Sequence, residues 1–168
     1  AYIAVNSAST QLQIIDVSNP DSLPTPVNIS VDGQGGRNIS VNQTATRAYL
    51  ATAESGTQKE FFIIDIDPAS PTYKNTLGSY NTNGMNPKGV AVVTSNKAVI
   101  VGTSAEEYQV IDIADETNPS RCGGIDIDTG VNGVASVLEQ DGDAYSYIIT
   151  GDANAELKII PGGAGGGQ

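Results

Sequence analysis

The sequence predicts an all-β protein in which four repeats of about 48 residues form the blades of a β-propeller. The first observation is a short apolar stretch that recurs along the chain and contains an aliphatic pair. The second residue of this pair is Ile at positions 15, 64, 111 and 160, so successive copies are 49, 47 and 49 residues apart. Short apolar runs at a period in the forties are typical of propeller blades. The second observation is that no stretch combines a 3.6-residue apolar period with capping residues, so we expect no helix.

Composition agrees with many short strands joined by turns. The 168 residues include 19 Gly and 8 Pro, whereas aromatic residues make up only 5%. This length corresponds to one domain. Gly and Pro between short apolar segments are typical of the turns in all-β domains.

Each complete repeat is expected to hold four strands: an inner strand, a second strand, the recurring apolar strand and an outer strand, joined as an antiparallel meander. The expected strands of the first two repeats are 1–6, 12–17 and 27–31, then 38–41, 47–52, 61–66 and 74–80. Those of the last two repeats are 89–93, 98–103, 108–113 and 124–127, then 133–138, 145–150 and 157–160. The first repeat therefore lacks an inner strand and the last lacks an outer strand, which gives 3, 4, 4 and 3 strands.

The pattern within the strands supports this assignment. Residues 1–6 alternate small and large apolar side chains, and the segment 47–52 matches them one repeat later. The recurring strand at 61–66 is apolar on both faces, which fits a sheet that lies between two others.

These elements place the repeat units at 1–32, 36–81, 86–128 and 131–161 of a single domain, 1–161. Residues 162–168 form a glycine-rich tail whose composition predicts flexibility. An open arc of blades would expose unpaired strand edges and apolar sheet faces, and repeat arrays avoid this by circular closure or by capping. We therefore expect the ends to meet in a four-bladed ring. The alternatives are a ring shared by two chains, or a larger propeller of which these repeats are one part.

A turn containing proline follows each of the first three recurring strands, and an Asp stands at its start. The turn prolines are Pro20, Pro68 and Pro119, and the Asp residues are Asp16, Asp65 and Asp112. A short carboxylate at this place can accept backbone N–H bonds from the turn that follows, so we interpret these residues as structural. The alternative is a Ca²⁺ site, which needs several converging oxygens.

Charge and residue content exclude several classes of function. The net charge of −11 argues against nucleic acid and against direct contact with an anionic membrane. The chain has no His, the commonest general base and metal ligand, and no motif marks a nucleophile or a phosphate loop. We therefore predict no enzymatic activity, no catalytic residues, no metal and no cofactor. The single cysteine, Cys122, is expected to be buried, as free cysteines commonly are.

Two further features concern the wider context of the chain. No apolar run reaches the roughly 18 residues that a membrane-spanning helix needs. The chain begins in strand pattern without an initiator Met, so we expect it to be a piece processed from a longer product.

One polar set is a candidate ligand site. Arg37, Lys88 and Asn132 each stand at the entry to an expected inner strand, and basic residues are scarce in this chain. If the repeats superpose, the three side chains converge at one mouth of the central channel, where they could bind an anion. The alternative is that they are solvated residues at strand ends.

The recurring strand, its Asp and the Ser-Asn-Pro turn after Asp16 resemble the LVIVD-type repeat. The copies at 12–26 and 61–71 match best, the copy at 108–119 has an insertion before Asn118-Pro119, and the copy at 157–161 has lost the Asp and the Pro turn. This resemblance implies a β-propeller of bacterial or archaeal secreted and surface proteins, some of them pilin-like or otherwise anchored. It implies no common enzymatic activity, so no catalytic residue carries over.

From the residues and this resemblance we predict a non-enzymatic binding or display domain, extracellular or on the cell surface. Its partner would be a protein or a glycan, and it would be attached to a surface-anchored parent chain. Two alternatives stay open: a structural spacer or head domain of a surface filament, and an accessory domain of an enzyme whose catalytic part lies elsewhere in the parent chain.

Overall fold

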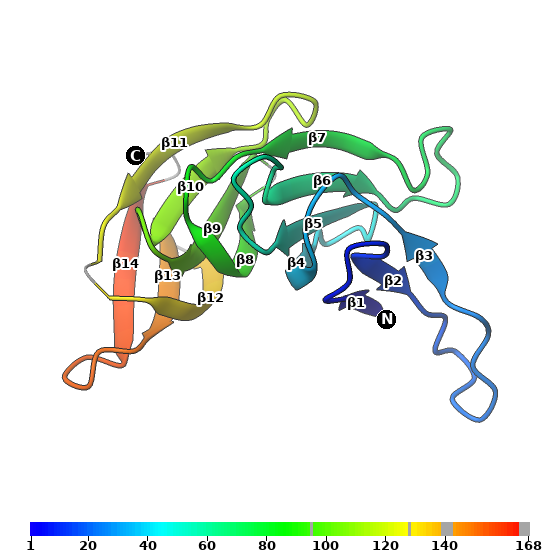
Figure 1. Ribbon diagram of the computed structural model, residues 1–168, viewed down its shortest axis with the longest axis horizontal. Helices are drawn as coiled ribbons and strands as arrows, with labels where there is room; N and C mark the ends of the chain where they lie inside the picture. The colour runs from blue at the N-terminus through cyan, green and yellow to red at the C-terminus, as the bar shows by residue number, and fades with distance from the viewer. Residues whose placement is uncertain (95, 128, 139–142, 165–168) are drawn as a thin grey trace.

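The computed structural model describes residues 1–94, 96–127, 129–138 and 143–164. Within this part of the chain there are fourteen strands and no helix, and the strands form four antiparallel sheets that follow one another in an arc (Figure 1). The described residues therefore contain no candidate for a membrane-spanning helix.

The first two sheets hold three and four strands. Sheet 1 comprises β1 (Tyr2–Ala4), β2 (Leu12–Ile14) and β3 (Val27–Ile29), and sheet 2 comprises β4 (Gly36–Val41), β5 (Arg47–Thr52), β6 (Phe61–Asp65) and β7 (Thr76–Tyr80). Each sheet is a meander in which neighbours in sequence are neighbours in space. The recurring apolar strand is β2 in the first sheet and β6 in the second.

The last two sheets repeat the arrangement with four and three strands. Sheet 3 comprises β8 (Asn86–Thr94), β9 (Lys97–Thr103), β10 (Tyr108–Asp112) and β11 (Ser120–Ile125), and sheet 4 comprises β12 (Val131–Leu138), β13 (Asp143–Thr150) and β14 (Leu157–Ala164). The predicted all-β class and the order of 3, 4, 4 and 3 strands are confirmed for the described residues. The predicted tail begins inside β14, which continues to Ala164, and residues 165–168 lie outside the described part.

Apolar clusters between successive sheets hold the arc together. We call the face of a sheet that packs on the next sheet its front face, and the opposite face its back face. The front of sheet 2 contributes Tyr49, Ala51, Phe61 and Ile63 to a cluster with the back of sheet 3. Similar clusters join sheets 1 and 2 and sheets 3 and 4. Because sheet 2 is covered on both faces, every residue of β6 is buried, which explains its continuous apolar run.

Glycine permits one of these sheets to approach its neighbour closely. A Cβ atom on Gly78 of β7 would overlap the backbone carbonyl of Glu116 and lie 2.8 Å from the Cδ of Pro119. The turn 115–119 of sheet 3 therefore packs on the bare backbone of the outer strand of sheet 2.

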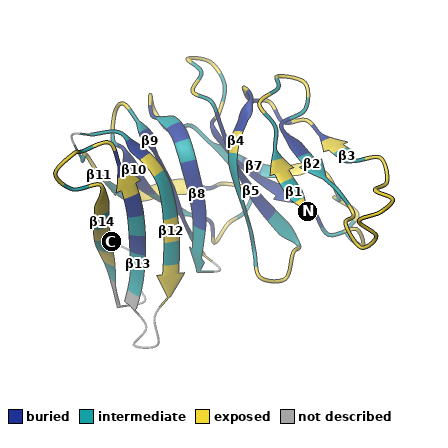
Figure 2. Ribbon diagram, turned by 90° about the horizontal axis from the view of Figure 1, so that it is seen from below, coloured by how far each residue is buried: buried dark blue, intermediate teal, exposed yellow. Residues whose placement is uncertain are grey.

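The two ends of the arc do not meet in the described part of the chain (Figure 1), so the expected four-bladed ring is wrong. The first and last sheets lie at opposite ends of the arc (Figures 1 and 2). The front face of sheet 4 is consequently uncovered: Ile149, Leu157 and Ile159 are 58%, 61% and 56% exposed. Their counterparts in sheet 3 lie against sheet 4, and Val101 there is fully buried. Four sheets at this spacing do not turn far enough to close, and the alternative of one part of a larger propeller fits the arc.

Candidate functional site

The three predicted ligand residues are the extra residues of β-bulges in the inner strands. In β4 the pairing with β5 shifts between Gly36 and Asn38, so that Arg37 has no cross-strand partner. The corresponding shifts in β8 and β12 skip Lys88 and Asn132. A bulge bends its strand and redirects the side chain of the extra residue. We refer to Arg37, Lys88 and Asn132 together as the bulge site.

Contacts between neighbouring inner strands bring the three bulges together. The inner strands β4, β8 and β12 follow one another along the concave side of the arc (Figure 1), and β8 contacts both of the others. The backbone N–H of Val90 donates to the Asn38 side chain at 3.1 Å. Asn38 follows Arg37 in β4, and Val90 lies two residues after Lys88 in β8, so this bond links the two bulges. Gly89 lies so close to Val134 that a Cβ there would be 3.2 Å from the Val134 backbone nitrogen.

The bulge site concentrates unpaired positive charge. Of the eight basic side chains of the protein, Arg47, Lys97, Arg121 and Lys158 form ion pairs with carboxylates. Arg37 and Lys88 form none with the residues that the structure describes, and Arg37 and Asn132 are exposed while Lys88 is half-buried. In a chain of net charge −11, the inner strands therefore hold two uncompensated cations and an amide on adjacent bulges.

The repeat Asp of sheet 2 is the centre of a buried network. The Oδ1 atom of Asp65 accepts the Asp67 N–H at 3.0 Å, and Oδ2 accepts the hydroxyls of Ser70 and Thr72, each at 2.5 Å. Arg47 of the neighbouring strand reaches the same carboxylate at 3.2 Å. Burial opposes ionisation of Asp65, but the hydroxyl and N–H donors and the Arg47 cation together hold its pKa below the ordinary value.

The other repeat Asp residues make simpler versions of this contact. Asp16 accepts the Ser18 N–H and Asp112 accepts the Ala114 N–H, both at 2.9 Å and both two residues onward, as in sheet 2. Pro20 and Pro68 lie in the turns that follow, and Pro119 lies immediately before β11. Asp112 also pairs with Lys97, and this pair with the Ala114 N–H lowers the pKa of Asp112. These are turn-forming contacts, and across the described residues no three metal-type side chains cluster in a way that could hold an ion.

A second recurring set of polar residues, missed in the sequence, immediately precedes the recurring strand. We call Gln11, Glu60 and Glu107 the brace residues, since each side chain accepts a backbone N–H just beyond the outer strand of its own sheet. The donors are Val31, Thr82 and Ile127, at 3.0, 2.9 and 2.9 Å respectively. Exposed fractions of 0%, 1% and 7% make the brace residues part of the interior. The period of the aliphatic pair could have found them, because 11, 60, 107 and 156 are also 49, 47 and 49 apart.

Cys122 is exposed, so the expectation of a buried thiol is wrong. The pairing of β10 with β11 shifts between Val110 and Ile111 and skips Cys122, which makes it a bulge residue of an outer strand. Outer strands lie on the convex side of the arc, where no further sheet covers them (Figure 1).

A groove of about 490 Å³ lies between sheets 2 and 3, away from the bulge residues. Two of its polar side chains are already engaged within the protein: Asn42 bonds Thr46 and the Arg47 N–H, and Glu116 pairs with Arg47 at 2.7 Å. Neither Asn42 nor Glu116 is therefore free to bind a ligand in this groove.

Comparison with known proteins places the fold. The structure is similar to that of the periplasmic gluconolactonase PpgL of Pseudomonas aeruginosa, with a TM-score of 0.65 and 10% identity over 99% of this chain and 56% of that chain. It is also similar to hydrazine synthase of Kuenenia stuttgartiensis, with a TM-score of 0.58 and 15% identity over 91% of this chain and 44% of that chain. The chain thus spans about half the length of either protein, and at these identities the likeness is one of fold. A comparison with curated proteins finds no matching sequence.

The LVIVD repeat matches residues 1–29 and 49–82. These ranges include the two copies that agreed best with the repeat in the sequence, while the copies in sheets 3 and 4 keep the strand positions with more divergent turns. Residues 1–29 and 49–82 thus carry LVIVD repeats, and the four antiparallel sheets of the described chain are arranged like the blades of a propeller.

Proposed function

We propose that the chain is a non-enzymatic binding domain that holds an acidic glycan at the bulge site. The observation that carries this proposal is the repetition of one bulge on three adjacent inner strands, with Arg37, Lys88 and Asn132 as the extra residues. Cations favour carboxylate or sulfate groups, and an amide can donate to and accept from sugar hydroxyls. An open, concave row of such groups suits an extended ligand better than a small enclosed one.

The proposal includes a location outside the cell or on its surface and an attachment to a surface-anchored parent, both of which rest on the LVIVD resemblance. It also includes no catalysis by this chain, which rests on the sequence alone, since the chain has no His and no motif that marks a nucleophile. The names of the two similar structures are those of enzymes, but a likeness of fold does not carry an activity.

The test is calorimetric titration with oligogalacturonate, with a neutral oligosaccharide of the same length as a ligand control. We expect the wild-type protein to bind the acidic sugar, and Arg37→Ser/Lys88→Ser to weaken binding by at least about tenfold, because two charge-assisted contacts are lost. The melting temperature should not change, since neither side chain has an ion-pair partner among the described residues.

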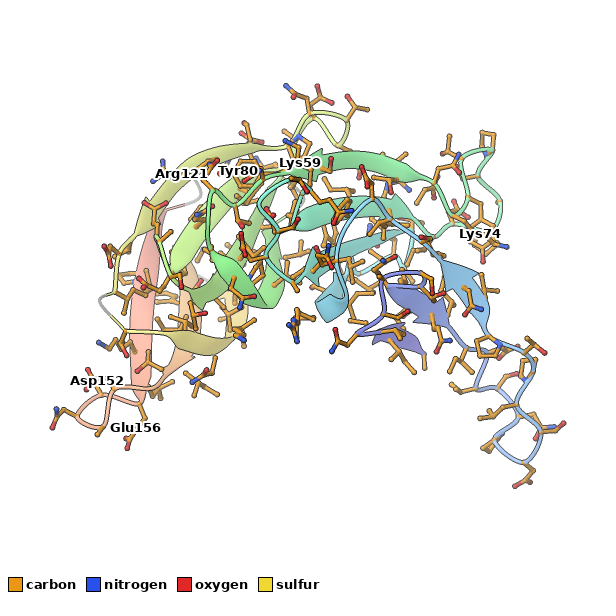
Figure 3. All side chains as sticks on the ribbon, viewed as in Figure 1. Lys59, Lys74, Tyr80, Arg121, Asp152 and Glu156 are labelled. Carbon is orange, nitrogen blue, oxygen red and sulfur yellow. The ribbon has the colours of Figure 1, made fainter. Side chains whose placement is uncertain are left out.

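Lys59→Ser/Lys74→Ser is the matched control. Both lysines also lack an ion pair in the described structure, and both lie away from the concave side (Figure 3), so the charge change is identical and the location differs. Equal loss of affinity in the two double variants would show a non-specific charge effect and overturn the proposal. So would a wild-type protein that does not bind the acidic sugar at millimolar concentration.

A further inference from the structure

The groove between sheets 2 and 3 contains a hydroxyl group that the fold does not use. The ring of Tyr49 on β5 stacks on Phe61 in the core, with 6.4 Å between the ring centroids, and Tyr49 is only 3% exposed. Its hydroxyl forms no hydrogen bond with a described residue, and in this part of the chain no side-chain oxygen or nitrogen is both sealed from solvent and unpaired. Because Tyr49 lines the groove, its hydroxyl opens into that space.

The position of Tyr49 does not require a hydroxyl to build a sheet. Tyr49 is paired with the first residue of the aliphatic pair in its own sheet, Ile63. The same position of sheet 3 is occupied by Val99, which is paired with Val110 and is equally buried. An apolar side chain therefore satisfies the packing at this position, and the Tyr49 hydroxyl is available for another contact.

The rest of the groove is apolar along one side and neutral in charge. Val41 at the end of β4 and Val92 and Val93 at the end of β8 are half-buried and line it. Among the described residues of the lining, Glu116 alone is charged, and its ion pair with Arg47 compensates that charge. A volume of about 490 Å³ is typical of pockets for small molecules. These features favour a neutral ligand with an apolar part over an ion.

We propose that this groove binds a small neutral carboxamide that carries an apolar ring. The Tyr49 hydroxyl donates to the carbonyl oxygen of the ligand, and the ring packs on the three valines. Burial and the nearby Glu116 carboxylate raise the pKa of Tyr49, so the phenol stays protonated and can donate. The exposed side chain of Gln43 also lines the groove and forms no hydrogen bond with a described residue, so its amide oxygen can accept the N–H of the ligand.

This site is independent of the bulge site, because the two lie at opposite ends of the inner strands. Arg37 and Lys88 stand near the start of β4 and β8, whereas Val41 and the segment 92–94 lie at the ends of the same strands. The bulge site offers positive charge and the groove offers none that is unpaired, so the two sites select ligands of different chemistry.

The probe is benzamide, titrated into the ¹⁵N-labelled protein and followed by NMR. At millimolar concentration we expect shift changes at residues 41–44, 49 and 92–94. Acetamide should bind much more weakly, because it has the amide without the ring. Benzoate should not shift these signals, because its charge would lie near Glu116 without a free cation to compensate it.

Tyr49→Phe separates a ligand contact from a structural role. It should weaken benzamide binding by about three- to tenfold, the effect of one lost hydrogen bond, and should leave the melting temperature unchanged, because the hydroxyl has no described partner to lose. Tyr147→Phe is the matched control: Tyr147 pairs with Ile159 at the same position of sheet 4 and does not line the groove, so this variant should bind as wild type does.

Three results would overturn the proposal. The first is that benzamide at millimolar concentration leaves the groove signals unchanged. The second is that acetamide binds as well as benzamide, which would show that the apolar wall is not used. The third is that Tyr49→Phe binds benzamide as tightly as wild type, or that it lowers the melting temperature markedly and so shows a structural hydroxyl.

Discussion

Replacing Asp65 with Ala tests how much the repeat Asp contributes to the stability of the fold. Four donors would lose their acceptor: the Asp67 N–H, the hydroxyls of Ser70 and Thr72, and the Arg47 guanidinium. Two of these losses are softened, since the Ser70 and Thr72 hydroxyls lie 3.0 Å apart and can bond each other. Arg47 keeps Glu116 at 2.7 Å, so its charge stays paired.

The loss of free energy of unfolding depends on how many of these donors are left without an acceptor. Hydrogen bonds to a charged group contribute about 1.5–3 kcal/mol each, and the buried acceptor serves several donors at once. With the replacements allowed for, we expect Asp65→Ala to lower the free energy of unfolding by about 3 kcal/mol. In a chain of this size that corresponds to a fall in the melting temperature of roughly 6–12 °C.

Urea unfolding followed by circular dichroism measures this change directly. The dependence of the free energy of unfolding on urea concentration should be the same in both proteins, which shows that both expose the same surface on unfolding. Asp16→Ala is the control, because Asp16 is exposed and accepts one local N–H, so it should have little effect. A loss below about 1 kcal/mol for Asp65→Ala would refute the reasoning. A loss of wild-type stability on adding EDTA would instead indicate that the Asp residues hold calcium.

Three further predictions follow from the same structure. Because the pKa of Asp65 is lowered on folding, its stabilisation is present above its unfolded pKa of about 4 and is lost as the pH falls through the folded value. The stability difference between wild type and Asp65→Asn should therefore shrink as the pH falls below about 4, and a constant difference would contradict this prediction. Gly78→Ala should destabilise by about 1–3 kcal/mol in chemical denaturation, since its Cβ overlaps the Glu116 carbonyl, whereas Gly133→Ala, whose Cβ meets no described atom within 4 Å, should not. Ile149→Ser/Ile159→Ser should reduce binding of the dye ANS with little loss of stability, because both side chains are exposed on the open front face of sheet 4. A large loss of stability, as expected on replacing the buried Ile148, would mean that this face is covered in solution.

The period of the aliphatic pair was enough to predict the strands and their grouping, because each repeat buries the same apolar positions. Phe61 to Ile64 are apolar on both faces since sheets lie on both sides of β6, and that requirement is visible in the sequence. Closure is different. It depends on how far each sheet turns from the one before, which comes from packing details such as the contact of Gly78 with the turn 115–119. No residue pattern encodes that angle, so the ring was predicted wrongly.

The candidate site was predictable in part. Arg37, Lys88 and Asn132 could be aligned by repeat position, but their bulges depend on cross-strand register, which the sequence does not state. The brace residues were missed for another reason. In the sequence, a Glu or Gln before an apolar strand looks the same as a solvated loop residue. Its role shows only in the fold, which brings the donor N–H beside it; for Glu107 this donor is 20 residues further along the chain.

The most direct test of the central claim is an NMR titration of the ¹⁵N-labelled protein with oligogalacturonate. If the bulge site holds an acidic glycan, the largest amide shift changes should fall at Arg37, Lys88 and Asn132 and their neighbours on β4, β8 and β12, and should disappear in Arg37→Ser/Lys88→Ser. Shift changes centred on Lys59 or Lys74, or none at millimolar ligand, would contradict the account.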